Sequence, residues 1–219
     1  MAEDARRKIL ARVAEATEGV RDDDPGRAQD ALPRGYRQQG ATAPAARLDR
    51  FEARLVDYGV DVVRTPVAGL PGRVAQEVAR RRVRRLVVPG ELPAAWLAAV
   101  PDVTRVDPVA DAAELVDADA TLTGCAVAIA ETGTLILDGG PGQGPRAGTL
   151  VPDVHLCVVH ASLLVELVPE AVARTKDSVA AGRPLTWISG PSATSDIELV
   201  RVAGVHGPRT LVVLLVTDA

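Results

Sequence analysis

The triplet Glu131-Thr132-Gly133 is the part of this sequence that points most directly to chemistry. It stands between two short apolar runs, residues 126–130 and 134–137. Gly133 has no Cβ and can adopt a positive φ, so the triplet predicts a tight turn between two buried strands. A carboxylate at the tip of a buried hairpin is costly unless it is paired, hydrogen-bonded or used. Glu131 is therefore a candidate functional carboxylate, and the alternative is a turn residue that faces water.

A second polar cluster has the sequence GPSATSDIE and covers residues 190–198, after a strand predicted over residues 185–189. Its hydroxyl groups are suited to capping a helix predicted over residues 195–202, and Ser195 with Glu198 fits a capping box. Loops that lead into a helix N-terminus are also where α/β proteins bind carboxylates and phosphates. Three neighbouring hydroxyl residues exceed the needs of one cap, so the loop is a candidate anion-binding loop, and helix capping alone is the alternative. Its candidate ligand-binding residues are Gly190, Ser192, Thr194, Asp196 and Glu198.

Two basic side chains stand in glycine-containing loops. His206 lies within GVHGPR, residues 204–209, where an imidazole could carry protons or pair with an anion; a solvated turn histidine is the alternative. Arg146 lies in the glycine-rich stretch 139–148, which matches a degenerate dinucleotide-binding pattern. That pattern must open a helix, and Pro152 arrives too early for three turns to form. Arg146 is therefore a candidate ligand-binding residue on a lid or binding loop, with a plain surface loop as the alternative.

The segment HLCVVH, residues 155–160, raises the question of a metal site. Residues of a strand alternate between its faces, so His155 and Cys157 point one way and His160 the other. Three ligands cannot converge from this strand alone, and two cysteines are too few for a cysteine-ligated iron–sulfur cluster. The sequence predicts structural roles for these residues, with no metal and no cofactor.

The composition is that of a globular protein. Of the 219 residues, 47% are apolar and 25% charged, but only 2% are aromatic, so Val, Leu, Ala and Ile must form the core. A net charge of −4 provides no field that would attract a phosphate backbone, and we expect no nucleic-acid partner. The charged N-terminal segment lacks the apolar region of a secretory signal, and no apolar run could span a bilayer. These features predict a cytoplasmic protein without a membrane span.

The pattern of apolar residues predicts an amphipathic helix over residues 2–18, a polar linker that completes an N-terminal arm of residues 1–44, and a domain over 45–219. Within the domain, helices are expected over 45–58, 72–82, 92–100, 109–116 and 195–202, with one or two helices over 162–181 broken near Pro169. Strands are expected over 60–64, 85–88, 103–106, 154–159, 185–189 and 211–217, besides the hairpin. The predicted fold class is α/β, with a Rossmann-like mixed sheet covered by helices on both faces.

Four segments occur in a recognisable order: TGCAVAIAETGTLIL, LVPDVHLCVV, GPSATSDIELV and GVHGPRTLVVLLV. In this combination the sequence resembles the lactate-utilisation protein C family, the LUD-domain proteins, strongly over residues 118–216 and in outline from residue 45. The resemblance implies a fold like those of ribose-5-phosphate isomerase, glucosamine-6-phosphate deaminase and the CoA transferases. It also implies a role in oxidising L-lactate to pyruvate, beside partner subunits that carry iron–sulfur clusters.

The sequence departs from the family pattern at three positions. Family members often have a basic residue where this chain has Ala193, alanine where it has Ser195, and a polar residue where it has Ala126. If the basic side chain binds a carboxylate in the family, Arg146 or Arg209 must take that role here.

Three functions follow as hypotheses. The first is a non-redox subunit of a lactate-oxidising system that binds a small carboxylate or a partner subunit. The second is an acyl-CoA or phosphoryl-ligand enzyme, because Glu131-Thr132-Gly133 resembles the E-x-G turn of CoA transferases. Glu131 would then be the nucleophile and His206 a proton carrier, with Thr132 and Gly133 contacting the ligand. The third is an interaction module whose loops only stabilise the fold. Both site hypotheses expect Glu131, the hydroxyl loop and His206 to border one cavity.

Overall fold

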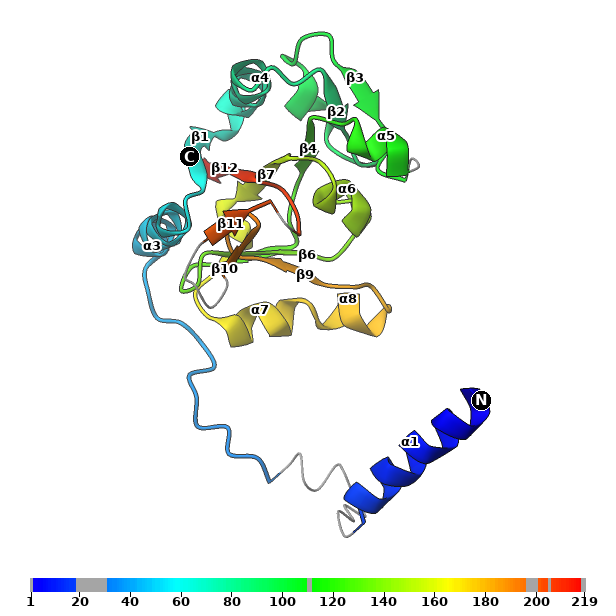
Figure 1. Ribbon diagram of the computed structural model, residues 1–219. Coiled ribbons are helices and arrows are strands. Elements are labelled where there is room, and N and C mark those ends of the chain that lie inside the picture. The colour runs from blue at the N-terminus through cyan, green and yellow to red at the C-terminus, as the bar shows by residue number, and fades with distance from the viewer. Residues whose placement is uncertain (1, 19–30, 110–111, 196–200, 205, 218–219) are drawn as a thin grey trace. The chain divides into compact units, whose positions relative to one another are not determined.

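The computed structural model describes residues 2–18, 31–109, 112–195, 201–204 and 206–217 (Figure 1). The chain divides into two units, residues 1–36 and residues 37–219. The first unit contains helix α1 (Ala2–Ala16), which confirms the helix predicted near the N-terminus. Its larger apolar side chains, Ile9, Leu10 and Val13, are exposed. Everything described below belongs to the second unit.

The main sheet has six strands, all parallel, in the order β1-β12-β7-β4-β2-β3. These are β1 (Asp61–Pro66), β12 (Thr210–Thr217), β7 (Val154–His160), β4 (Ala120–Thr123), β2 (Arg85–Val87) and β3 (Thr104–Val106). Residues 211–216 of β12 are all buried, as are residues 155–159 of β7. Strands that are apolar on both faces must be covered on both sides, and this explains the long uninterrupted runs of Val and Leu.

The predicted hairpin lies in a second, four-stranded sheet with the order β8-β5-β6-β9. Its strands are β8 (Leu164–Val165), β5 (Val127–Ile129), β6 (Thr134–Leu137) and β9 (Thr186–Ile188). Strands β5 and β6 are antiparallel, as the sequence predicts, and Gly133 in their turn has φ +61°. Strand β9 adds antiparallel to β6, whereas β8 adds parallel to β5. The antiparallel hairpin of this α/β fold thus lies outside the main sheet.

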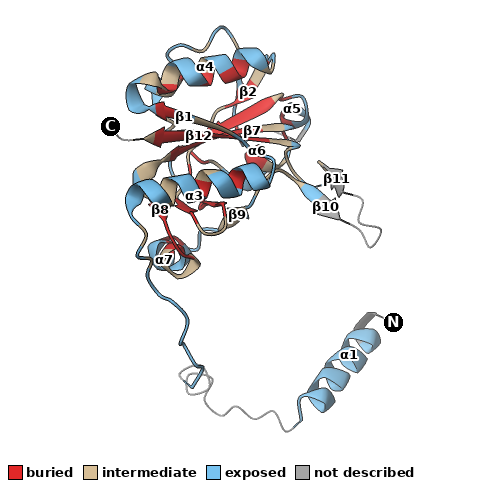
Figure 2. Ribbon diagram, turned by 90° about the vertical axis from the view of Figure 1, so that its left-hand side faces the viewer, coloured by how far each residue is buried: buried red, intermediate tan, exposed pale blue. Residues whose placement is uncertain are grey.

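Helices cover both faces of the main sheet (Figure 2). Helix α4 (Leu70–Arg80) packs Leu70, Val74 and Val78 on one face. On the other face, helix α3 (Pro44–Asp57) and the hairpin share one core, in which Phe51 and Leu55 are fully buried. Helix α7 (Val168–Arg174) covers the outer face of the second sheet. Three short helices complete the unit: α5 (Ala112–Val116), α6 (Arg146–Leu150) and α8 (Lys176–Ala180).

The prediction of a helix over residues 195–202 is wrong. The chain instead forms two short antiparallel strands, β10 (Ala193–Ser195) and β11 (Arg201–Ala203), in which Thr194 pairs with Val202. Because Ser195 belongs to a strand, it does not cap a helix as predicted, while Asp196 and Glu198 lie outside the described residues. β-Branched residues favour such a ribbon over a helix of this length.

Two other helices differ from the prediction. Residues 92–100 form only a 3₁₀ turn (Ala94–Leu97) after Pro93, in place of the predicted helix. In the 162–181 region, helices α7 and α8 are separated at Thr175, and Pro169 lies in the first turn of α7 rather than at the break. Proline is tolerated in a first turn because its missing N–H would have no partner there.

Candidate functional site

A cavity of about 250 Å³ lies between the amino ends of β7 and β12 and the end of β9. His155 and Leu211, the second residues of β7 and β12, contribute to its wall. The polar side chains that line it come from α6, β7, β9 and the loops on either side of the β10–β11 ribbon: Arg146, Thr149, His155, Thr186, Ser189, Ser192 and His206. Apolar wall is provided by Leu150, Ile188, Pro191, Pro208 and Leu211.

The structure brings four of the predicted site residues together around this cavity: Arg146, Gly190, Ser192 and His206. Two loops that are distant in sequence are joined by hydrogen bonds at Ser192. The Ser192 hydroxyl accepts a hydrogen bond from the His206 backbone N–H at 3.0 Å, and the Ser192 N–H donates to the Pro208 carbonyl at 2.9 Å. These bonds fix the hydroxyl loop against the histidine loop, and both loops form one wall of the cavity.

Gly190 is required by its conformation and by its neighbour. It has φ +90°, and a Cβ placed there would lie 2.8 Å from the Cβ of Tyr58. A larger residue would collide with Tyr58 and push the loop away from the C-terminal end of α3. It would also be strained, because residues with a Cβ disfavour a positive φ. The end of α3 therefore sets the position of the loop that carries Ser192.

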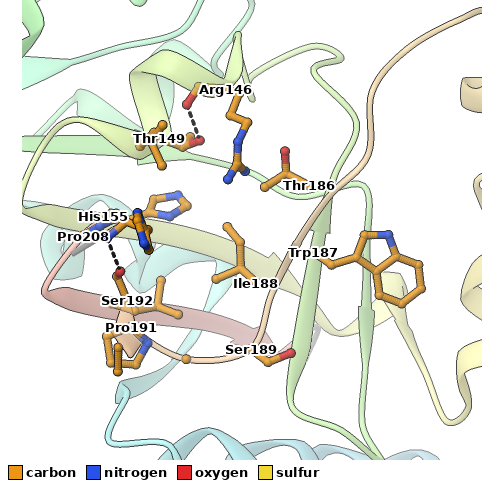
Figure 3. A pocket seen from close by; sticks show the side chains of 16 residues that line it. Arg146, Thr149, His155, Thr186, Trp187, Ile188, Ser189, Pro191, Ser192 and Pro208 are labelled. Atoms are coloured by element: carbon orange, nitrogen blue, oxygen red, sulfur yellow. Dashed lines mark hydrogen bonds between the residues drawn. The ribbon is translucent and has the colours of Figure 1, made fainter. Parts of the chain in front are cut away.

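Among the described residues that line the cavity, Arg146 is the only arginine, and it begins α6. Figure 3 shows its guanidinium directed into the cavity, opposite the His155 ring. In the described part of the chain no carboxylate lies within ion-pair distance of Arg146. The guanidinium is thus available to an anion that enters the cavity.

His155 is a lining residue to which the sequence analysis assigned only a structural role. It is 1% exposed, and its Nε2 is hydrogen-bonded to the Thr123 hydroxyl at 2.7 Å. Strand β4, which carries Thr123, was not predicted, because its short apolar run merges with the hairpin that follows. Alternation along β7 correctly placed His155 and Cys157 on one face of the strand. Nothing in the sequence indicated that Thr123 on the neighbouring strand would be hydrogen-bonded to His155.

Glu131 does not line this cavity. It borders a separate groove with Arg54, Asp57 and Thr132, and the expectation of a single cavity shared with Ser192 and His206 is not met. Its Oε1 lies 2.7 Å from Arg37 Nη2, and the glutamate side chain is 41% exposed. The Glu131 carboxylate is therefore held at the surface by a residue that precedes α3.

A chain of hydroxyl groups nevertheless links the Glu131 turn to the cavity wall. The Thr132 and Thr134 hydroxyls are 2.7 Å apart, and the Thr134 and Ser189 hydroxyls are 2.8 Å apart. Ser189 lines the cavity, so the turn contributes to the site through its neighbours rather than through its carboxylate.

Two thiols are buried in the domain core. Cys125 and Cys157 are both reduced, and the Cys157 thiol donates a hydrogen bond to the Gly124 carbonyl. A hydrogen bond to Cys157 and burial raise the pKa of Cys125 well above its ordinary value. Among the described residues, no group of three His, Cys, Asp or Glu side chains is placed to hold a metal ion. No helix in the same residues is long and apolar enough to cross a bilayer.

The parallel sheet, the second sheet with its E-T-G turn and the cavity lined by strands of both sheets define an α/β protein of the LUD type. The chain belongs to the LUD-domain family, whose model matches residues 72–216. A Lactate utilization protein C from Deinococcus radiodurans is 50% identical over 191 residues, which cover 87% of this chain and 89% of that relative.

More distant relatives match only part of their length. A Lactate utilization protein C from Geobacillus sp. is 32% identical over 42% of this chain and 39% of its own length. The uncharacterized protein YkgG of Escherichia coli is 31% identical over 51% of each chain. The fold is also that of a crystal structure of a DUF162 family protein from Deinococcus radiodurans. It has a TM-score of 0.70 and 46% identity, and the match covers 80% of this chain and 99% of that one.

Proposed function

We propose that this chain is a non-redox subunit of a lactate-utilisation system and binds a small carboxylate in the Arg146 cavity. Its relatives named Lactate utilization protein C support the lactate-utilisation role. In this proposal, partner subunits with iron–sulfur clusters carry the electrons of L-lactate oxidation to pyruvate. The chain itself recognises the acid or presents it to those subunits.

The observation that carries the proposal is the Arg146 guanidinium, which has no carboxylate partner among the described residues and points into a small cavity. An arginine fork matches a carboxylate in geometry and charge, and such bonds are stronger than neutral ones. A volume of about 250 Å³ suits an acid of a few carbon atoms rather than a nucleotide or a CoA ester. Ile188 and Leu211 supply apolar contacts for a methyl group.

Titration calorimetry of the full chain with lactate and pyruvate tests the proposal. Replacing Arg146 with Gln removes a charged hydrogen bond, so we expect affinity to fall about tenfold to hundredfold. Arg209→Gln is the matched control, because Arg209 is 63% exposed, pairs with Asp153 at 3.8 Å and does not line the cavity. The proposal fails if neither acid binds the unaltered chain, or if Arg146→Gln binds them equally well.

The alternative enzyme function, with Glu131 as nucleophile, gains no support from this geometry. Glu131 lies outside the cavity, and its carboxylate is engaged by Arg37. We therefore base the proposed function on Arg146 and the loops around it.

A further inference from the structure

The floor of the cavity holds a buried imidazole that the proposed function does not require. Binding of a simple carboxylate needs Arg146 and little else. Yet His155, at 1% exposure, is a polar side chain set within an apolar core strand and lining the same cavity. Burial of a polar group is costly unless its hydrogen bonds are made, so the position of this ring calls for a partner.

One ring nitrogen of His155 already has a strong partner. Nε2 is hydrogen-bonded to the Thr123 hydroxyl at 2.7 Å, and both side chains are buried on adjacent parallel strands. This bond fixes the rotation of the ring. The other nitrogen, Nδ1, makes no hydrogen bond to a nitrogen or oxygen atom of another described residue, and the neighbouring Cys157 thiol is only a weak hydrogen-bonding group. A ligand in the cavity can therefore complete the hydrogen bonding of the imidazole.

Three of the hydroxyl groups that line the cavity are already engaged with protein. The Ser189 hydroxyl is bonded to Thr134, and the Ser192 hydroxyl accepts from the His206 N–H. The Thr149 hydroxyl donates to the Arg146 carbonyl. Arg146 and His155 are thus two ligand-facing groups that enter from different elements, α6 and β7, and converge on one small space (Figure 3).

We propose that the cavity selects monocarboxylates that carry an oxygen on C2, with Arg146 binding the carboxylate and His155 binding the C2 oxygen. This inference rests on the proposed function and narrows its ligand class to 2-hydroxy and 2-oxo acids. In such acids the C2 oxygen is adjacent to the carboxylate, so one small ligand can meet both groups at once. Thr123 is a positioning residue, since it holds the ring without touching the ligand.

The hydrogen-bond direction at Thr123 decides which acid is preferred. If the Thr123 hydroxyl donates to Nε2, then Nδ1 carries the proton and can donate to a 2-oxo or a 2-hydroxy group. If the hydroxyl accepts from Nε2–H, Nδ1 is an acceptor and only a 2-hydroxy group can bond to it. A preference for either acid over an unsubstituted one supports the inference.

The test compares propionate, lactate and pyruvate by titration calorimetry of the full chain. Propionate has the same number of carbons but no C2 oxygen. We expect lactate or pyruvate to bind about tenfold to hundredfold more tightly than propionate, the effect of one hydrogen bond to a buried group. In His155→Phe this selectivity is lost, whereas propionate binds as before.

Two further variants separate recognition from folding. Thr123→Val has nearly the same shape and frees the ring, so selectivity should fall while propionate affinity is kept. Thr121→Val is the matched control: Thr121 lies opposite His155 on β4, and its buried hydroxyl has no hydrogen-bond partner in the described residues. This control should retain full selectivity.

The outcomes distinguish the two proposals. If the unaltered chain binds none of the three acids, both the proposed function and this inference fail. If it binds all three equally, or if His155→Phe and Thr123→Val both retain the selectivity, the inference is overturned and the carboxylate site stands. Equal loss for all three acids in both variants would also overturn it, since the ring would then only support the cavity.

Discussion

Asp138 shows how a single buried carboxylate positions the loop that carries Arg146. Its Oδ1 accepts hydrogen bonds from the Gly140 N–H at 3.0 Å and from Gln143 at 2.9 Å. Its Oδ2 accepts one from the Ser178 hydroxyl at 2.6 Å and lies 2.9 Å from Arg183 Nη2. Burial alone would raise the pKa of Asp138, but these bonds and the charge of Arg183 outweigh it and lower the pKa. The glycine-rich loop is thus fixed to α8 by an ionised side chain.

Folding lowers the pKa of Asp138. Its contribution to stability is therefore fully present above the pKa of the unfolded chain, about 3.9, and is lost as the pH falls through the lower pKa of the folded chain. Asp138→Asn should reduce the free energy of unfolding by about 1–3 kcal/mol at neutral pH, since it breaks a buried network. The stability of this variant should also depend less on pH in the acid range. Urea unfolding at a series of acid and neutral pH values measures both effects.

The matched control is Asp57→Asn, because Asp57 is 66% exposed and pairs with Arg54 one turn earlier in α3. Exposed pairs of this kind contribute about 0–1 kcal/mol. Equal losses at the two positions would contradict the role given to Asp138.

At the scale of elements, the C-terminal end of α3 supports two tight turns of the domain. Arg54 lies against Gly133 of the hairpin, and Tyr58 lies against Gly190 of the cavity loop. A Cβ at Gly133 would be 2.8 Å from the Arg54 Cβ and 3.1 Å from its carbonyl carbon, and Gly133 has φ +61°. Both contacts depend on glycine, so one helix end orients the Glu131 turn and the wall of the cavity together.

Gly133→Ala should therefore cost more than its backbone conformation alone. A positive φ costs about 1–2 kcal/mol for a non-glycine residue, and crowding against α3 should raise the total to about 2–4 kcal/mol. Gly59→Ala is the control, since Gly59 has φ +77° and a Cβ added there would meet no atom within 4 Å. Denaturant unfolding compares the two variants, and equal losses would show that the Arg54 contact is unimportant.

Elements with a strong apolar pattern were predictable from the sequence. The buried runs of β7 and β12, the helices α3 and α4 and the hairpin at Gly133 follow from periodicity and one turn residue. Short strands such as β4 and β8, and the β10–β11 ribbon, depend on partners supplied by the folded chain. Arg146, Ser192 and His206 could be selected because they stand in polar loops. His155 was not expected to line the cavity, because its partner comes from another strand. Glu131 was expected at the cavity, but it does not line it.

At the scale of the whole molecule, the domain core and the cavity are formed by residues of the second unit, 37–219. Its first residues are tied to the second sheet: Arg37 pairs with Glu131, and the Thr42 N–H donates to Glu166 Oε2 at 2.6 Å. A backbone hydrogen bond from Thr42, together with Arg50 and Arg37, lowers the pKa of Glu166 although its burial opposes this. Residues 37–43 therefore contribute to the domain without belonging to a helix or strand.

A chain shortened to residues 37–219 keeps the domain core, the cavity and residues 37–43, so it should bind the same acids as the full chain. A chain shortened to residues 44–219 should unfold at a lower temperature than this one, because it lacks Arg37 and Thr42 and leaves Glu166 without two of its partners. Differential scanning calorimetry of both chains measures the contrast. Equal midpoints for the two would refute a stabilising role for residues 37–43.

The place of β12 in the main sheet has a consequence for biosynthesis. It lies between β1 and β7. The Thr217 hydroxyl at its end donates a hydrogen bond to the Thr65 carbonyl of β1, and these two residues are 152 positions apart in the chain. While the ribosome is still translating the residues before 210, the backbone N–H and C=O groups along the facing edges of β1 and β7 have no strand to pair with. A nascent polypeptide in that state is prone to aggregate, so chaperones that shield such edges should govern how much protein reaches the native state.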